Sequence, residues 1–137
     1  MGRIRRFSIS IDKELLRKFD KYIKEKKYPT RSKAVEDLMR SALVEREWLE
    51  GKEVVGALVI VYNHHKRELV AKLTDTGHDF HDIILSTQHI HLDEENCFEI
   101  IAVKGTPSKI EELKNRLRAI KGIKHCSLAA TTTGKEV

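Results

Sequence analysis

The feature that most constrains the fold is an apolar, β-branched stretch that carries two histidines, His89 and His91. On a β-strand, residues two apart point to the same face, so the two imidazoles would share one side of a sheet. Cys97 follows across the polar cluster 93–96, which predicts a hairpin turn. Imidazole nitrogens and a thiolate that converge on one face are suited to binding a transition metal.

The length of this turn decides which face Cys97 occupies. Directly opposed residues of an antiparallel pair share a face. Pairing His91 with Cys97 leaves a five-residue loop over 92–96 and places Glu99 opposite His89. A loop one residue shorter would turn the thiol away, so we expect the five-residue loop or an equivalent bulge. Glu99 would then accept a hydrogen bond from an imidazole N–H.

Composition allows one ordinary domain or two small ones within the 137 residues. The formal net charge of +5 permits a nucleic-acid partner without proving one. Two cysteines do not make a disulfide framework. The chain has no apolar run of about 20 residues and no signal peptide, so we expect a cytoplasmic protein with no membrane partner.

Residues 1–50 predict a strand followed by two helices. Residues 6–11 alternate strictly, with Phe7, Ile9 and Ile11 on one face. Asp12 is a suitable N-cap for the first helix, and Thr30 for the second. A unit of this size is marginal as a monomer, so its apolar strand face predicts a dimer in which two strands pair antiparallel.

Such a two-stranded ribbon fits the major groove of DNA, with basic and hydroxyl side chains facing outward. The outward residues are Arg6, Ser8 and Ser10. An ordinary solvated strand face is the alternative interpretation. Two further arginines, Arg3 and Arg5, favour DNA binding instead. So does the start of the second helix, where Arg31 and Ser32 could hold a phosphate.

Residues 51–137 predict a second domain in the order βαββαβ. Strands are expected over 54–62, 83–92, 98–103 and 124–132, and helices over 67–76 and between Thr106 and Gly122. This order predicts a ferredoxin-like sheet with helices on one face, as in ACT-like ligand-sensing domains. The predicted fold class is therefore α+β.

The first domain resembles the ribbon-helix-helix family of DNA-binding proteins. The resemblance lies in the alternating segment RFSISID and in the segment YPTRSKA that leads into the second helix. It implies that Arg6, Ser8 and Ser10 read bases. It also implies that the region of Arg31 and Ser32 grips the DNA backbone.

The spacing His78-x10-His89-x-His91-x5-Cys97, combined with the first domain, resembles the nickel-responsive transcriptional regulator family (NikR) from residue 6 to about residue 132. The resemblance implies a homotetramer, built as a dimer of dimers, with one Ni(II) per subunit in a square plane. His89, His91 and Cys97 would come from one subunit and His78 from a neighbour. It further implies a repressor that binds palindromic operator DNA when nickel is bound and so controls nickel uptake.

Three other residues would have auxiliary roles. In some family members Asp37 helps to hold a second cation, together with a Glu at the position of Lys33. Here the Lys33 ammonium could replace that cation. His81 is a candidate low-affinity ligand, and His64 a candidate auxiliary metal residue.

Other functions predict different features. The closest alternative is a sensor of another transition metal, Co or Cu, with the same architecture. A metalloenzyme would need a general acid or base, and beyond Glu99 no catalytic constellation is present, so we expect no enzymatic activity. An antitoxin, another common ribbon-helix-helix protein, would have a disordered C-terminus rather than a folded second domain.

Overall fold

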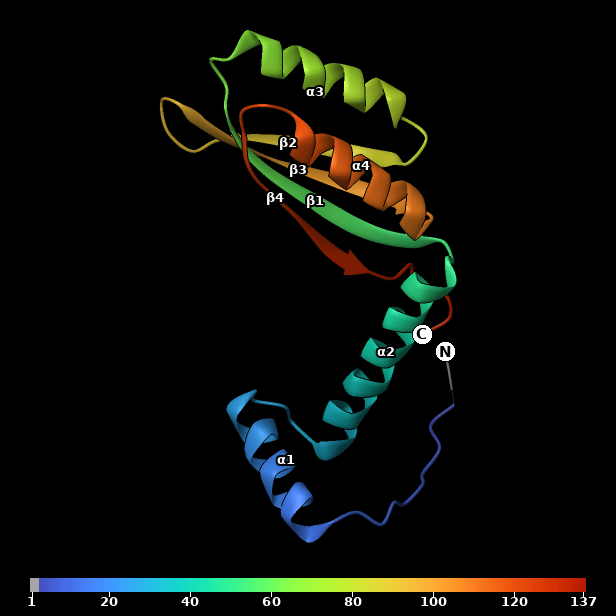
Figure 1. Ribbon diagram of the computed structural model, residues 1–137. Coiled ribbons are helices and arrows are strands. Elements are labelled where there is room, and N and C mark those ends of the chain that lie inside the picture. Colours follow the sequence, from blue (N-terminus) through green and yellow to red (C-terminus); the bar gives the residue numbers. More distant parts are fainter. Residues whose placement is uncertain (1–2) are drawn as a thin grey trace. The chain divides into compact units, whose positions relative to one another are not determined.

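The computed structural model describes residues 3–137, which divide into two compact units (Figure 1). The first unit extends to Ser41 and the second begins at Ala42. The elements are α1 (Lys13–Glu25), α2 (Arg31–Glu50), β1 (Val54–Asn63), α3 (Arg67–Asp79), β2 (Ile84–His91), β3 (Asn96–Gly105), α4 (Pro107–Ala119) and β4 (Ile123–Thr131). The predicted α+β class is confirmed, and the division into units lies about nine residues before the expected boundary at residue 50.

Both helices of the first unit begin at the expected caps. The Asp12 carboxylate accepts a hydrogen bond from the Leu15 amide at 2.9 Å. The Thr30 hydroxyl accepts one from the Lys33 amide at 3.1 Å. Each bond satisfies a backbone donor that the first helical turn leaves unpaired, which fixes where the helix starts.

The strand expected over residues 6–11 is not formed within the single chain: residues 3–12 run without regular secondary structure. The reason is physical, because a strand needs a neighbouring backbone to pair with and the described part of the chain provides none there. Phe7, Ile9 and Ile11 consequently remain exposed, at 64%, 61% and 42%.

The second unit is a four-stranded sheet in the order β2-β3-β1-β4, with every neighbouring pair antiparallel. Figure 1 shows α3 and α4 on the same side of this sheet. Alternate residues of β1 are buried against these helices, among them Leu58 and Ile60. Leu69 of α3 and Leu113 of α4 complete the same apolar cluster. The expected strand order and helix-covered face of an ACT-like domain are therefore observed.

Two turns of the second unit use residues with special backbone properties. Thr106 caps α4 and Pro107 occupies its first turn, as predicted. Gly122 has φ +104°, and a β-carbon built there would lie 2.7 Å from Cδ1 of Leu69. A side chain at this position would therefore be strained by the backbone and would also collide with α3.

Candidate metal centre

The hairpin between β2 and β3 has the register that the sequence predicts. His91 is paired with Cys97, and His89 is paired with Glu99. Five residues, 92–96, therefore separate the innermost pair. On the other side of β3, Cys97 is paired with Tyr62 of β1, so side chains from three strands meet on one face of the sheet.

The turn of this hairpin is held by Asp93. Its carboxylate accepts hydrogen bonds from the backbone amides of Glu95 and Asn96, at 2.9 and 2.7 Å. The Asn96 side-chain amide donates to both carboxylate oxygens. These backbone and side-chain donors lower the pKa of Asp93 because they stabilise its charged form. The loop is thus fixed by its own sequence.

The Cys97 thiol lies at the centre of three imidazoles. Its Sγ atom is 3.0 Å from Nδ1 of His64, 3.2 Å from Nε2 of His89 and 3.3 Å from Nδ1 of His91. Cys97 is completely buried, whereas His89 and His91 are largely exposed at the sheet edge. The folded backbone therefore already places the sulfur close to the ring nitrogens.

His64 reaches this group from the end of β1. Its backbone amide donates to the Glu95 carbonyl at 3.1 Å, which ties the segment after β1 to the hairpin turn. The donor atoms of His64, His91 and Cys97 all lie within 4.8 Å of one another. His64 was expected to be an auxiliary residue, and in the single chain it is one of the three donors that lie closest together.

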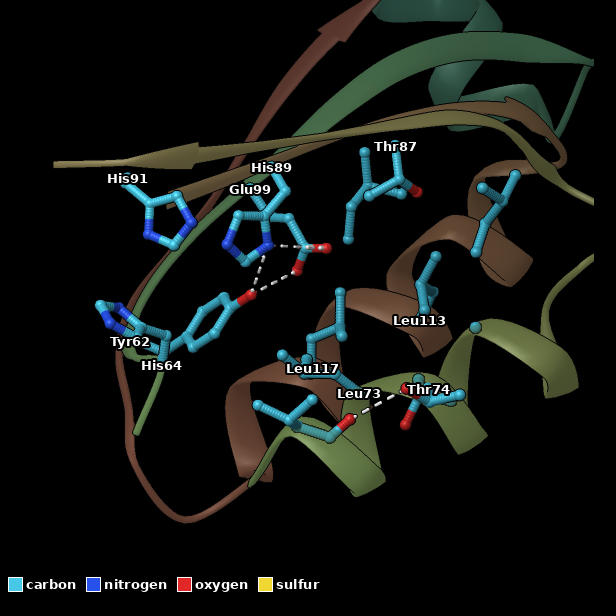
Figure 2. Close-up of a pocket in the computed structure, with 15 residues that line it drawn as sticks. Tyr62, His64, Leu73, Thr74, Thr87, His89, His91, Glu99, Leu113 and Leu117 are labelled. Carbon is cyan, nitrogen blue, oxygen red and sulfur yellow. Dashed lines mark hydrogen bonds and ion pairs between the residues drawn. The ribbon is translucent and has the colours of Figure 1, made fainter. Parts of the chain in front are cut away.

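Tyr62 orients His89 from the opposite side (Figure 2). The Tyr62 hydroxyl lies 3.3 Å from Oε2 of Glu99 and 3.1 Å from Nδ1 of His89. Because the hydroxyl donates its single hydrogen to the carboxylate, it accepts from Nδ1–H of His89. The Nε2 lone pair of His89 is then directed toward Cys97, the arrangement that a metal-binding imidazole needs.

This arrangement corrects one detail of the sequence prediction. Glu99 lies opposite His89 as expected, but the nearest imidazole nitrogen is 4.0 Å from its Oε1 atom. That separation exceeds a hydrogen bond, so Tyr62 bridges the two side chains. Sequence reasoning missed Tyr62 because its place beside Cys97 follows from the β1–β3 pairing, which the local pattern does not reveal.

The electrostatic environment follows from burial. Burial raises the pKa of the Cys97 thiol, and the carboxylates of Glu99 and Asp93 add to this effect. Burial also raises the pKa of Glu99, against the opposing influence of His89 and Tyr62. Desolvation and the neighbouring imidazoles lower the pKa of His64, which favours its neutral, metal-binding form.

A cavity of about 510 Å³ opens beside these side chains, between the sheet and the helices α3 and α4. Figure 2 shows His89, His91 and Glu99 on its sheet side and Leu113 and Leu117 of α4 opposite. One end of the cavity therefore carries the imidazoles of the candidate centre, and the remaining walls combine apolar side chains with Thr74, Thr76 and Thr87.

The donor set fits a borderline-soft transition metal. Imidazole nitrogen binds Ni, Cu and Zn, and a single thiolate adds the softness that excludes Mg and Ca. The chain matches the family model described as the NikR C terminal nickel binding domain over residues 55–131. This chain belongs to the NikR family.

Curated relatives agree with this assignment over nearly the whole chain. A protein of Syntrophus aciditrophicus, named "Putative nickel-responsive regulator", is 51% identical over 135 residues, which cover 98% of each chain. A protein of the same name from Thermococcus onnurineus is 48% identical and covers 98% of this chain and 99% of its own. The relatives are named as regulators, which supports the expectation of a non-enzymatic NikR protein.

One solved structure has a similar fold. The uncharacterized protein TM1266 from Thermotoga maritima superposes with a TM-score of 0.53 at 19% identity, covering 58% of this chain and 98% of that one. At this identity the similarity concerns the fold alone.

Among residues 3–137, no helix has both the length and the apolar character needed to cross a membrane.

The fourth expected NikR ligand is not brought to the thiol within the single chain. His78 is exposed in the last turn of α3. His81 lies just beyond this helix, and its Nδ1 atom is 2.9 Å from the carbonyl oxygen of His78. The single NikR subunit therefore gathers His64, His89 and His91 around Cys97, and it leaves His78 and His81 outside.

The expected DNA-binding residues lie in the first unit and are exposed. They are Arg3, Arg5, Arg6, Ser8, Ser10, Arg31 and Ser32. Arg31 has a partner already, because its Nε and Nη2 atoms donate to the two carboxylate oxygens of Asp20 at 2.8 and 2.7 Å. Arg31 must share or exchange this carboxylate if it is to bind a phosphate.

Asp37, which was expected as an auxiliary metal residue, forms an ion pair with Lys33. The Lys33 ammonium lies 2.7 Å from Oδ1 of Asp37, one helical turn away. Lys33, and after it Tyr28, lowers the pKa of Asp37 by hydrogen bonding to its charged form. The ammonium therefore provides the positive charge beside Asp37, as the sequence suggested.

Proposed function

We propose that this chain is a nickel-dependent transcriptional repressor. It would bind palindromic operator DNA when Ni(II) occupies a site made by His78, His89, His91 and Cys97, and so control nickel uptake. The observation that carries the proposal is the convergence of ring nitrogens on the buried Cys97 thiol, at 3.0–3.3 Å. Family membership supplies the nickel-binding domain in which this convergence occurs.

The chain's own residues prepare the ligands. Tyr62 and Glu99 hold His89 in the tautomer whose Nε2 lone pair faces Cys97. Burial raises the pKa of the Cys97 thiol, because desolvation disfavours the charged thiolate. When bound, Ni(II) would supply the positive charge that stabilises the thiolate, so binding should release a proton from Cys97.

We infer that His78 acts in trans, from a neighbouring subunit of a homotetramer with one Ni(II) per subunit. Two features support this: the exposure of His78 at the end of α3 and its separation from the thiol of its own chain. His64 holds a position beside the thiol that His78 of the neighbour would have to share or take. Nickel would then link subunits as well as side chains.

The first unit would bind DNA as a dimer in the cytoplasm. The exposed alternation of Phe7, Ile9 and Ile11 supports antiparallel pairing of two copies, which would bury these side chains. Pairing would direct Arg6, Ser8 and Ser10 to the opposite face, where they could reach base edges in the major groove. Two such dimers flanking one tetramer would bind two half-sites together, which raises affinity through avidity.

The first test compares Cys97→Ala and His78→Ala with His81→Ala in the full-length protein. Loss of either ligand should weaken nickel binding by at least about a hundredfold, more than is typical for a residue that only orients a ligand. His81→Ala is the matched control from the same segment and should bind one equivalent as the wild type does. Absorption titration of the thiolate–nickel band gives the affinity, and a mobility-shift assay gives the dependence of DNA binding on nickel.

Mixing the two defective proteins tests ligation in trans. Mixed tetramers of Cys97→Ala and His78→Ala subunits contain some sites with both groups intact, so a thiolate–nickel band should reappear after subunit exchange. A band that never returns, in tetramers shown to be mixed, would refute trans ligation. Parallel titrations with Co(II), Cu(II) and Zn(II) distinguish nickel from the alternative metals. Cu(II) is expected to bind these ligands most tightly whichever metal is sensed. The sensed metal is therefore the one that switches DNA binding at a free concentration available in the cell.

A further inference from the structure

The last turns of α2 are built into the second unit. The indole nitrogen of Trp48 donates to the Thr131 carbonyl of β4 at 2.9 Å. The Trp48 ring packs against the core where β1 carries Gly56, and Cη2 lies 3.8 Å from the place a β-carbon would take. A β-carbon there would be in ordinary contact with the indole, and it would crowd the Ala129 carbonyl oxygen and Cδ1 of Leu128, each 3.1 Å away.

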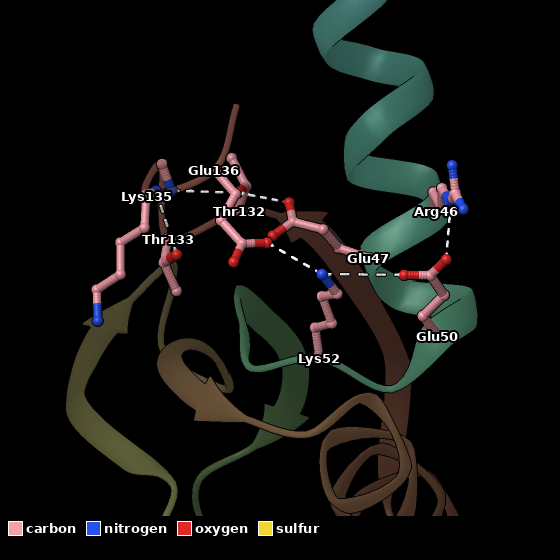
Figure 3. A network of polar contacts seen from close by, with 9 residues as sticks. Arg46, Glu47, Glu50, Lys52, Thr132, Thr133, Lys135 and Glu136 are labelled. Atoms are coloured by element: carbon pink, nitrogen blue, oxygen red, sulfur yellow. Dashed lines mark hydrogen bonds and ion pairs between the residues drawn. The ribbon is translucent and has the colours of Figure 1, made fainter. Parts of the chain in front are cut away.

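A second contact lies beside the first. Glu47 is 6% exposed, and its Oε1 atom accepts a hydrogen bond from the Thr132 hydroxyl at 2.8 Å (Figure 3). The Glu47 backbone carbonyl accepts from the Lys52 amide at 3.1 Å, which closes the end of the helix. A carboxylate this buried depends on its donor, because an unpaired polar group away from water is costly. We call Glu47, Trp48, Thr131 and Thr132 the clasp.

The clasp and the metal centre lie toward opposite ends of β1. Gly56 lies under Trp48, and Tyr62 is paired with Cys97. Both residues belong to the buried face of β1 and are six positions apart, about 20 Å along a strand. Thr131, which accepts the Trp48 hydrogen bond, is paired with Val55 of the same strand. One strand therefore contacts both groups.

We propose that the clasp is the element that transmits the state of the metal centre to α2. Glu47, Trp48 and Thr132 would act as positioning residues, which neither bind nickel nor touch DNA. The proposal rests on the proposed function, because α2 runs unbroken from Arg31 to Glu50 and begins with the residues expected to grip phosphate. A sheet ordered by metal would hold the end of this helix, and a sheet without metal would release it.

This route differs from a flexible joint at Glu50–Gly51. Gly51 does end the helix, with φ +74°. Yet it follows Glu47 and Trp48 in the chain, so a hinge there would lie within the second unit. If the backbone at Gly51 were flexible, the contacts of Glu47 and Trp48 with Thr132 and Thr131 would still fix how α2 leaves the sheet.

The test uses Thr132→Val, which keeps the shape of the side chain and removes the hydroxyl donor to Glu47. Thr132→Ser restores the donor. Glu136→Gln is the matched control from the same tail. It removes the exposed ion pair between Glu136 and Lys52, whose Oε2 and Nζ atoms are 3.1 Å apart, and it leaves the clasp intact. Trp48 is the only tryptophan of the chain, so its emission reports directly on the clasp.

Besides the Trp48 emission, two measurements are made on each full-length protein, with and without nickel chloride. The first is amide hydrogen exchange over residues 42–50. The second is the affinity for a duplex selected on the wild-type protein in the presence of nickel. In the wild type and in Thr132→Ser, nickel should slow exchange over residues 42–50 and blue-shift the Trp48 emission. Thr132→Val should bind nickel with an affinity within about twofold of the wild type, but nickel should no longer protect residues 42–50. The factor by which nickel raises its DNA affinity should be about tenfold smaller than in the wild type.

The outcomes separate this inference from the proposed function. Nickel-dependent protection of residues 42–50 that persists unchanged in Thr132→Val would overturn the clasp as transmitter. Absence of such protection in the wild type would overturn it as well. Protection without any effect of nickel on DNA affinity would instead contradict the repressor function and leave the structural coupling in place. If Glu136→Gln behaved like Thr132→Val, the tail as a whole would be responsible and the specific role of the clasp would be refuted.

Discussion

The two units of this chain differ in how much of their apolar surface they can bury alone. The second unit encloses a core in which Leu58, Ile60 and Val103 are inaccessible to solvent. In the described part of the first unit, Ile23 and Ala34 are the buried apolar residues, and Phe7 is 64% exposed. The second unit can therefore hold its shape as a single copy, whereas the first unit, as we propose, would complete its core only with a second copy.

The largest effect should come from the core of the second unit. Leu58→Ala removes a fully buried side chain from the central strand and should destabilise that unit by about 2–5 kcal/mol. Because this core lies within one chain, the loss should not depend on protein concentration. Denaturant unfolding followed by far-ultraviolet circular dichroism at two concentrations would measure it. A difference between Leu58→Ala and the wild type that changed with concentration would contradict a core built within one chain.

A smaller, concentration-dependent effect is expected in the first unit. Phe7→Ala should weaken pairing of two copies by about 1–3 kcal/mol, the free energy of burying one large apolar side chain. The apparent melting temperature of the Phe7→Ala protein should then fall further below that of the wild type as the protein is diluted. Ile4→Ala is the matched control, since Ile4 is 97% exposed and lies outside the alternating segment. Equal losses in both variants would count against the paired ribbon.

The smallest effect should be a change in acid sensitivity at α1. Hydrogen bonds from Arg31 lower the pKa of Asp20 below its ordinary value of 3.8. A carboxylate with a lowered pKa stabilises the fold above its unfolded pKa, and this contribution is lost as pH falls through the folded one. Asp20→Asn should therefore flatten the pH dependence of stability below about pH 4. Glu14→Gln is the control: it breaks the separate ion pair with Arg17 and should leave the contribution of Asp20 in place. Acid titrations of the three proteins by circular dichroism would show it.

The hairpin was predictable because it depends on a local rule. Side chains alternate with a period of two, so the choice of a five-residue loop fixed the partners of Cys97 and Glu99 together. Caps at Asp12, Thr30 and Thr106 were predictable for a similar reason, since each depends on a hydroxyl or carboxylate within three residues of the amide it serves.

What the sequence concealed depends on distant contacts. Tyr62 joins the metal centre through the pairing of β1 with β3. His64 was expected only in an auxiliary role, and its contact with the thiol joins residues more than thirty positions apart. Trp48 belongs to the second unit through a bond to Thr131, a residue more than eighty positions further along the chain. The strand expected over residues 6–11 is not formed in the single chain, because a strand needs a neighbouring backbone, and its pairing with a second copy stays a prediction.

The turn held by Asp93 separates two properties of the metal centre that usually change together. Its carboxylate organises the loop and is not among the side chains that converge on Cys97. A substitution there would change how much order the loop must gain before metal is captured, while every ligand kept its identity. Evolution could therefore adjust the metal concentration at which the protein responds without altering which metal it prefers.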